Sequence, residues 1–239
     1  MKITIVGAGR AGHSFSRALR DVGHEVQLVH HDEVERVAES ALVLLTVPDD
    51  AIESLSRSLP RRRDVVVAHV AGSRGLAELS GHPRAAFLHP LVALANPEVG
   101  AVRLRGALFS VGGDALAEEV VASLQGRVLR LDDEQRALYH ATASVAANHL
   151  VALMGHVQVL AESAGLTLED FLPLAHQALS DVSSLGVDRA LTGPASRADM
   201  ATIDAHLAAI PESERAAYVA MANVAFDVAE RRRHFARLT

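Results

Sequence analysis

The stretch Ile5-Val6-Gly7-Ala8-Gly9-Arg10-Ala11-Gly12 decides the fold of this chain. It places a G-x-G-x-x-G motif directly after an apolar run and at the start of a helical pattern. In this setting the first glycine permits a tight turn, the second lets the backbone approach a pyrophosphate, and the third lets the helix pack close to the strand. The N–H groups and dipole of that helix then hold phosphates. The motif predicts a dinucleotide site with contacts at Gly7, Gly9, Arg10, Ala11 and Gly12. The alternatives are a purely structural turn and a site for a flavin or another nucleotide.

The first half of the chain, up to Leu131, alternates short apolar β-type runs with helical stretches. Several of the runs are continuous Val, Leu and Ile, which is typical of strands covered by helices on both faces. This alternation predicts an α/β fold with a doubly wound, mostly parallel Rossmann sheet. The expected strands are Ile3–Val6, Glu25–Val29, Leu42–Val47, Val65–Val70, Ala86–His89, Ala107–Val111 and Arg127–Leu131. The expected helices between them are Ala11–Val22, Val34–Glu39, Asp50–Leu59, Gly75–Leu79 and Ala115–Leu124.

The sequence pattern changes after residue 131, where alanine-rich helical patterns replace the strands. Glycine at the end of a pattern and proline just beyond it mark helix ends. We therefore expect two domains, a Rossmann dinucleotide-binding domain over residues 1–131 and an all-α domain over residues 132–239 for substrate binding or dimerisation. The expected helices are Glu134–Ala164, Leu168–Leu185, Ser196–Ile210 and Glu212–Arg237.

Composition excludes several classes of protein. The formal net charge of −6 argues against nucleic-acid binding, and the absence of cysteine excludes thiol catalysis and disulfides. The only lysine is Lys2, at the wrong end of its strand for ligand binding, so lysine chemistry is excluded. The 13 histidines show no HxxxH or HExxH spacing on a predicted helix, so no metal site is predicted. We expect no membrane-spanning stretch and a cytoplasmic protein.

The choice between NADP and NAD depends on the end of the second strand. NAD-binding folds usually carry an acid there for the ribose hydroxyls, whereas this chain has His30 and His31. These histidines favour NADP, with NAD as the alternative, although two surface histidines in a loop would look the same. Thr46, Val47 and Pro48 lie at the carboxyl end of the third strand and are expected beside the nicotinamide.

Several motifs resemble the 6-phosphogluconate dehydrogenase-like superfamily. Gly23-His24-Glu25-Val26 and Leu44-Leu45-Thr46-Val47-Pro48-Asp49-Asp50 are similar to its second-strand entry and to its turn beside the nicotinamide. The superfamily includes pyrroline-5-carboxylate reductase, prephenate dehydrogenase, deazaflavin-dependent NADP reductase and the β-hydroxyacid dehydrogenases. The resemblance is strongest to the branch of Rossmann-like proteins with domain of unknown function 2520. Its signatures are His89-Pro90-Leu91, Tyr139-His140-Ala141, Ala147-Asn148-His149-Leu150, Leu191-Thr192-Gly193-Pro194-Ala195-Ser196-Arg197-Ala198-Asp199, Thr202-Ile203 and His206-Leu207. The resemblance implies a helical C-terminal domain and a homodimer built through its helices.

Two positions depart from these patterns. In the branch, serine and glycine follow a histidine in the fourth-strand loop, but here Ala71 stands at the serine position, so a hydroxyl contact there is lost or shifted to Ser73. The β-hydroxyacid dehydrogenases carry a helix lysine four residues before an asparagine. The matching pair here is Ser144 and Asn148, so this chain should not use their mechanism.

Candidate reaction residues lie near the expected nicotinamide or on the long helix. His89 ends a strand at the carboxyl edge of the sheet, and His149 is the better proton donor because imidazole titrates near neutral pH. Asn148 and Ser144, four residues apart on one helix face, are expected to orient and bind substrate. All four could instead be structural, satisfied by loop backbone, helix packing or a dimer contact.

Arg197 and Asp199 are the remaining candidate substrate residues. Arg197 is a candidate clamp for a substrate carboxylate, with Asp199 beside it. Asp199 lies near a helix start and could equally cap that helix or pair with Arg197.

The leading functional hypothesis is an NAD(P)H-dependent oxidoreductase that reduces a small carbonyl or imine compound by hydride transfer. The alternative is a dinucleotide-binding sensor or scaffold without turnover, which the missing lysine and the missing serine at position 71 keep open.

Overall fold

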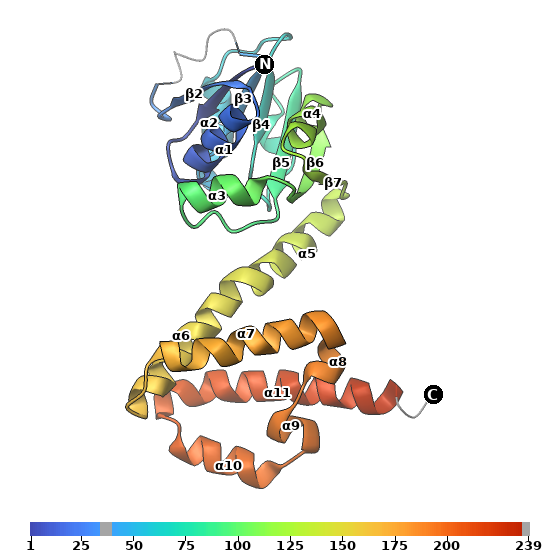
Figure 1. Ribbon diagram of the computed structural model, residues 1–239. Coiled ribbons are helices and arrows are strands. Elements are labelled where there is room, and N and C mark those ends of the chain that lie inside the picture. The colour runs from blue at the N-terminus through green and yellow to red at the C-terminus, as the bar shows by residue number, and fades with distance from the viewer. Residues whose placement is uncertain (34–39, 236–239) are drawn as a thin grey trace. The chain divides into compact units, whose positions relative to one another are not determined.

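A seven-stranded sheet organises the first part of the computed structural model, which describes residues 1–33 and 40–235 (Figure 1). The strand order is β2-β1-β3-β4-β5-β6-β7. The first five strands are parallel, β6 runs antiparallel to β5, and β7 runs parallel to β6. The mostly parallel Rossmann sheet is therefore confirmed. The strands are β1 (Lys2–Val6), β2 (Glu25–Val29), β3 (Leu42–Leu45), β4 (Val66–His69), β5 (Ala85–Pro90), β6 (Leu108–Gly113) and β7 (Arg127–Leu129).

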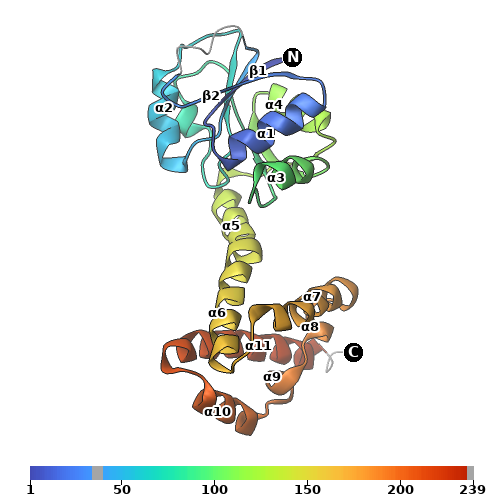
Figure 2. The ribbon, with the colours of Figure 1, turned by 60° about the vertical axis from the view of Figure 1, so that its left-hand side comes forward.

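Helices cover both faces of this sheet and bury two apolar clusters (Figure 2). One cluster joins the sheet to α1 (Arg10–Asp21), α3 (Pro97–Leu104) and α4 (Leu116–Ser123). The other joins it to α2 (Ile52–Ser58) and the short 3-10 turn η3 (Ala77–Leu79). All four residues of β3 are buried, as they are in β4, which explains why these strands read as unbroken apolar runs. The predicted helix Val34–Glu39 lies outside the described residues.

Helix α3 is absent from the sequence prediction. Asn96 caps it by accepting a hydrogen bond from the Val99 N–H at 2.9 Å, and Pro97 occupies the first turn. This Asn-Pro-Glu start is a helix N-terminus signal. Gly100 then faces Ser14, so α3 packs against α1 at a distance that only glycine allows.

The rest of the chain that the structure describes, up to residue 235, is helical, as predicted. The chain divides into two compact units, Met1–Ala147 and Asn148–Thr239, so α5 belongs to the first unit. A π-helical turn interrupts the long predicted helix between α5 and α6. The domain boundary near residue 132 stays a prediction. The elements are α5 (Asp133–Ser144), the π-helical turn (Val145–His149), α6 (Leu150–Ser163), α7 (Leu168–Leu185), α8 (Val187–Ala190), α9 (Gly193–Arg197), α10 (Met200–Ala209) and α11 (Glu212–Phe235).

The single helix predicted over Ser196–Ile210 is wrong. Ala198 adopts a left-handed conformation with φ of 55°, which ends α9 and lets Asp199 start α10 as its N-cap. An alanine in this conformation carries no sequence signal, because the conformation usually selects glycine or asparagine.

The expectation that no stretch could span a membrane also needs correction. The helical run Glu134–Ser163 is long and apolar enough by length and composition, with a mean hydropathy of 1.3 over its best window. None of that window is buried. The run nevertheless contains Asn148, His149 and His156, so its surface is mixed rather than uniformly apolar.

Candidate functional site

The loop between β1 and α1 requires glycine at its first position. Gly7 has φ of +114°, and its N–H donates to the Val29 carbonyl at 2.9 Å. A Cβ on Gly7 would lie 2.8 Å from the Thr46 carbonyl oxygen, and one on Gly12 would collide with the Gly7 carbonyl. The first and third glycines therefore let strand, loop and helix approach each other closely.

Thr46 fastens this loop to the sheet. The side chain is buried, and its hydroxyl donates to the Gly7 carbonyl at 2.8 Å and the Val6 carbonyl at 3.2 Å. Val47 contacts the same turn, because its Cγ1 lies 3.0 Å from the place of a Cβ on Gly7. Pro48 is exposed at the start of the short 3-10 turn η2 (Asp49–Ala51). Thr46 and Val47 thus support the glycine loop from the neighbouring strand.

The start of α1 fits a pyrophosphate. Gly9, its N-cap, is exposed, and a Cβ there would meet nothing within 4 Å. Its glycine is therefore not required by the protein's own packing. Among the described residues, no side chain caps α1 and no acid lies in its first turn. The first N–H groups of a helix have no partner within it, so those of Gly9, Arg10 and Ala11 suit an anionic ligand. Arg10 is exposed beside them.

His30 and His31 lie where the second strand ends. Both are exposed, and the His30 N–H donates to a Glu33 carboxylate oxygen at 3.3 Å. Both side chains are therefore open to solvent in the loop at the carboxyl end of β2.

His89 lies in a cluster where α5 meets the carboxyl end of β5. Its Nδ1 is 3.2 Å from the Tyr139 hydroxyl, with the two rings perpendicular and their centroids 5.7 Å apart. The His140 ring lies edge-on at 5.8 Å. Burial, followed by the charge of nearby His140, lowers the pKa of His89 to about 4. The ring is consequently neutral at physiological pH.

A second histidine, His69, holds the loop that follows β4. Its Nε2 donates to the Gly75 carbonyl at 2.8 Å, and its Nδ1 accepts from the Ala71 N–H at 3.2 Å. These contacts define the neutral tautomer, and burial lowers the pKa of His69. In the same loop, the Ser73 hydroxyl donates to Asp49 at 2.6 Å. A hydroxyl contact is therefore present at Ser73 although position 71 is alanine.

Gly72 of that loop lies against the His89 cluster. A Cβ on Gly72 would be 2.5 Å from His140 Nδ1 and 2.8 Å from His89 Nε2. Arg136, one turn before His140, is buried with its guanidinium carbon 3.8 Å above the centre of the Phe87 ring. The β4 loop, β5 and α5 thus converge at one place, and glycine at position 72 makes room for two imidazoles.

The structure brings only some of the predicted site residues together. The glycine loop, Thr46, Val47, Pro48 and His89 share the carboxyl edge of the parallel strands. Ser144 ends α5 half-buried, and Asn148 and His149 are exposed in the π-helical turn. Such turns are frequent at functional sites.

The structural alternative for Asp199 is supported. Its carboxylate accepts from the Thr202 N–H at 3.1 Å and from the Thr202 hydroxyl at 2.8 Å, which lowers its pKa. It therefore caps α10, while Arg197 is exposed at the end of α9.

Sequence reasoning did not select five residues of the cluster and its loop as site residues, namely Tyr139, His140, Arg136, Gly72 and His69. The signal was partly present, since Tyr139-His140 is one of the quoted signatures. Within the described ranges, no group of three His, Cys, Asp or Glu side chains could hold a metal.

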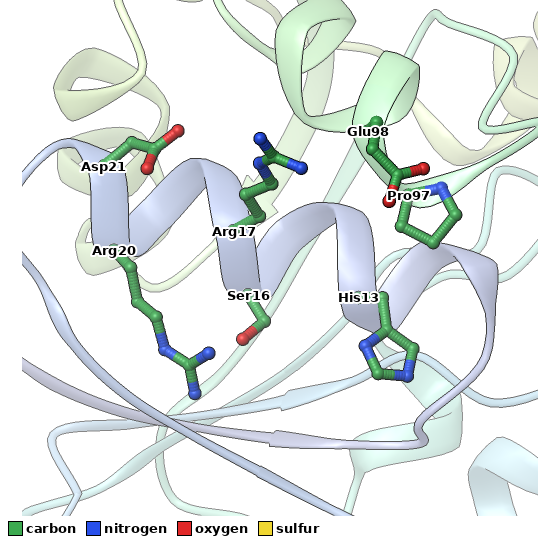
Figure 3. Close-up of a pocket in the computed structure, with 7 residues that line it drawn as sticks. All are labelled: His13, Ser16, Arg17, Arg20, Asp21, Pro97 and Glu98. Carbon is green, nitrogen blue, oxygen red and sulfur yellow. The ribbon is translucent and has the colours of Figure 1, made fainter.

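Two surface hollows lie outside this cluster. The first, of about 300 Å³, is lined by residues of α1 and α3, among them His13 and Glu98 (Figure 3). Two of its charged groups have partners, since Arg20 donates to the Val26 carbonyl and Asp21 accepts from Arg105. The second, of about 350 Å³, lies beside η2 and η3 and is lined by Asp49, Asp50, Glu53, Arg74, Ala77 and Glu78.

The sequence of this chain matches one known protein family. Residues 111–225 match the family described as Domain of unknown function (DUF2520), so the chain carries this domain, as its signatures predict. No curated protein matches the chain in sequence.

Solved structures show the same fold along nearly the whole chain. A candidate NADP oxidoreductase from Bacteroides fragilis is 19% identical, with a TM-score of 0.81 over 95% of this chain and 98% of that one. A reductive aminase from Aspergillus terreus, in complex with NADPH and ethyl-5-oxohexanoate, is 16% identical, with a TM-score of 0.69 over 96% and 97%. A pyrroline carboxylate reductase from Plasmodium falciparum with NADP bound is 10% identical, with a TM-score of 0.63 over 97% of each chain.

Proposed function

We propose that this DUF2520-domain protein is an NADPH-dependent oxidoreductase that reduces a small carbonyl or imine compound. The observation that carries the proposal is the start of α1. Gly9 is open to solvent there, with neither a side-chain cap nor an acid among the described residues nearby. Similar folds were solved with NADPH or NADP, which supports the same cofactor here.

The dinucleotide would be held by the glycine loop and the two strands beside it. Gly9, Arg10 and Ala11 would bind the pyrophosphate, and Thr46, Val47 and Pro48 would line the nicotinamide end. His30 and His31, exposed at the end of β2, would favour the 2′-phosphate of NADPH over the bare ribose of NADH. Fluorescence titration with both cofactors tests this preference, and tighter binding of NADH would contradict it.

The reaction needs a proton for the carbonyl oxygen or imine nitrogen as well as the hydride that the bound nicotinamide supplies. His89 and its neighbours lie at the carboxyl edge of the sheet, the same edge as the glycine loop. His149 is a second candidate for proton transfer, with Asn148 and Ser144 orienting the substrate and Arg197 binding a substrate carboxylate. The variant His149→Ala tests this second candidate: a loss of turnover with NADPH affinity spared would place His149 in the mechanism, and unchanged turnover would remove it.

Single-turnover absorbance at the reduced nicotinamide band tests the function. The wild-type protein, loaded with NADPH, should oxidise it when mixed with a member of a panel of keto acids and cyclic imines. Tight NADPH binding with no oxidation across the panel would favour the alternative, a dinucleotide-binding sensor or scaffold.

We further propose a soluble, cytoplasmic homodimer formed through the helices. Large apolar side chains are exposed along α5, α6, α7 and α11, including Leu138 at 72%, Val151 at 73% and Leu174 at 63%. Large exposed apolar surfaces are uncommon on monomers, and a dimer contact would cover such side chains. Both large apolar clusters of the described chain lie in the first unit, so the helices have little core of their own. One chain has a mass of 25.3 kDa, and sedimentation equilibrium should give twice that mass.

A further inference from the structure

The sequence contains two tyrosines, and each bonds to a histidine. Tyr218 bonds to His206 at 2.7 Å between two helices of the second unit. Tyr139 is different in its placement, because its hydroxyl contacts His89 Nδ1 at the carboxyl end of β5. That end lies on the edge of the sheet where the glycine loop and the Thr46 turn also lie.

We propose that Tyr139 is the proton donor of the reduction and that neutral His89 is its positioning residue, through an Nδ1–H that donates to the phenol oxygen. This inference rests on the proposed function. As hydride adds to the carbonyl or imine carbon, the Tyr139 O–H bond breaks and its proton goes to the substrate oxygen or nitrogen. The phenolate that remains keeps the His89 hydrogen bond and regains a proton from solvent.

The direction of the hydrogen bond decides whether the phenol can donate. If Nδ1 accepted, the Tyr139 proton would be engaged by His89, and a departing proton would leave a phenolate facing a nitrogen lone pair. If Nδ1–H donates, the phenol proton is free for the substrate, and the bond strengthens as negative charge develops on oxygen. Only the second arrangement stabilises the transition state more than the ground state.

The surroundings keep His89 fixed and neutral. Its Nε2 edge lies against Gly72, and its Nδ1 edge lies against Tyr139. The other titratable or charged groups that act on it are His140, Asp49, Arg136 and His69. Burial lowers the pKa of His89 to about 4, so His89 itself is not an imidazolium acid near neutral pH. Burial also raises the pKa of Tyr139, which keeps the phenol protonated before the reaction.

The tautomer of His89 gives a readout that needs no turnover. Nitrogen-15 NMR of the full chain with NADPH bound, assigned by comparison with His89→Gln, should show a neutral ring protonated on Nδ1. A ring protonated on Nε2 overturns the proposal.

Single-turnover NADPH oxidation, with 2-methyl-1-pyrroline and pyruvate as probes, supplies the second readout. Tyr139→Phe should slow hydride transfer about 100-fold, the usual contribution of a positioned acid, and leave NADPH affinity unchanged. Tyr218→Phe is the matched control because it removes the other Tyr–His bond, and it should react at the wild-type rate.

Two substitutions of His89 separate positioning from packing. The amide nitrogen of asparagine reaches the place of Nδ1, whereas that of glutamine reaches the place of Nε2. His89→Asn should therefore retain a rate within about 10-fold of wild type, while His89→Gln should fall as far as Tyr139→Phe. Equal losses of rate in both variants would show that His89 acts only through packing and would overturn its role in positioning Tyr139.

The failure of the inference and the failure of the function give different results. If the wild-type protein reduces a probe and Tyr139→Phe reduces it equally fast, Tyr139 is not the donor and the function stands. If the wild-type protein binds NADPH and reduces neither probe, the reductase proposal fails for these classes, and the donor role of Tyr139 fails with it.

Discussion

Replacing Gly72 with alanine should push a methyl group against the imidazole rings of His89 and His140. The added Cβ would lie 2.5 Å from His140 Nδ1, about 0.9 Å short of the 3.4 Å at which ordinary contact begins, and about 0.6 Å short of it for His89 Nε2. Both neighbours are stiff rings on separate elements, β5 and α5, so neither can yield by rotating a flexible chain end. Gly72 does not have a positive φ, so the substitution strains contacts and not the backbone.

The expected cost combines two terms of opposite sign. Overpacking a buried position typically costs about 1–3 kcal/mol, and replacing glycine by alanine recovers about 0.4–1 kcal/mol by restricting the unfolded chain. The free energy of unfolding should therefore fall by about 1–2 kcal/mol, with the denaturant midpoint shifted and the slope unchanged. Because displacement of a reacting group by about 1 Å can cost roughly 100-fold, single-turnover hydride transfer should slow by about 10- to 100-fold.

The matched control is Gly81→Ala in the same unit. The three atoms nearest to its Cβ would all belong to the Arg61 side chain, the first at 3.1 Å, and that exposed arginine can move. It should leave both stability and rate near wild type. A Gly72→Ala protein with the unfolding midpoint and the rate of Gly81→Ala would refute the claim that the β4 loop holds the two imidazoles in place.

Three further outcomes follow from the described contacts. Gly12→Ala should destabilise the first unit by at least about 1 kcal/mol, measured by urea unfolding, because its Cβ would collide with the Gly7 carbonyl; near-neutral stability would contradict the close approach of loop and helix. His89 has a folded pKa of about 4 against 6.5 unfolded, so the folded state binds fewer protons between these values and stability falls as pH is lowered through that window. The slope should be about 1.4 kcal/mol per pH unit and should be absent from His89→Gln, whereas equal slopes in both proteins would assign the loss to other groups. Val151 is 73% exposed and is one of the apolar side chains that the proposed dimer would bury. Val151→Glu would place a charge in that interface, so sedimentation should show dissociation to monomers. An intact dimer would locate the interface elsewhere.

The sheet was predictable from the sequence because its physical signals are local. Strands covered on both faces are continuous apolar runs, and the strand bounds from Ile3 to Leu129 agree with the structure within about two residues. The glycine loop was equally readable, since the collision at Gly12 and the positive φ of Gly7 each require glycine. Ala198 escaped prediction because it ends α9 in a left-handed conformation that its side chain does not favour, next to an Asp199 N–H that donates to the Pro194 carbonyl.

The site was less predictable because its parts are far apart in the chain. Tyr139 and His89 are separated by 50 residues, and their contact exists only because α5 returns to the end of β5. His89 could be selected by its place at a strand end. Its neutrality depends on burial, which no local pattern reveals, and so does the room that Gly72 leaves for it.

The absence of a lysine from the site and the presence of the Tyr139–His89 pair both concern which group donates the proton. A lysine donor begins as a cation and becomes neutral on giving up its proton, so it needs no partner to stabilise its product. A phenol becomes an anion in the same step, and an anion in a partly buried place needs a donor aimed at it. A neutral histidine with Nδ1–H directed at the phenol oxygen meets that need without adding a charge to the resting site. With Lys2 as the only lysine, the proton must come from another group, and Tyr139 is the hydroxyl donor that the fold pairs with a histidine at the carboxyl end of β5.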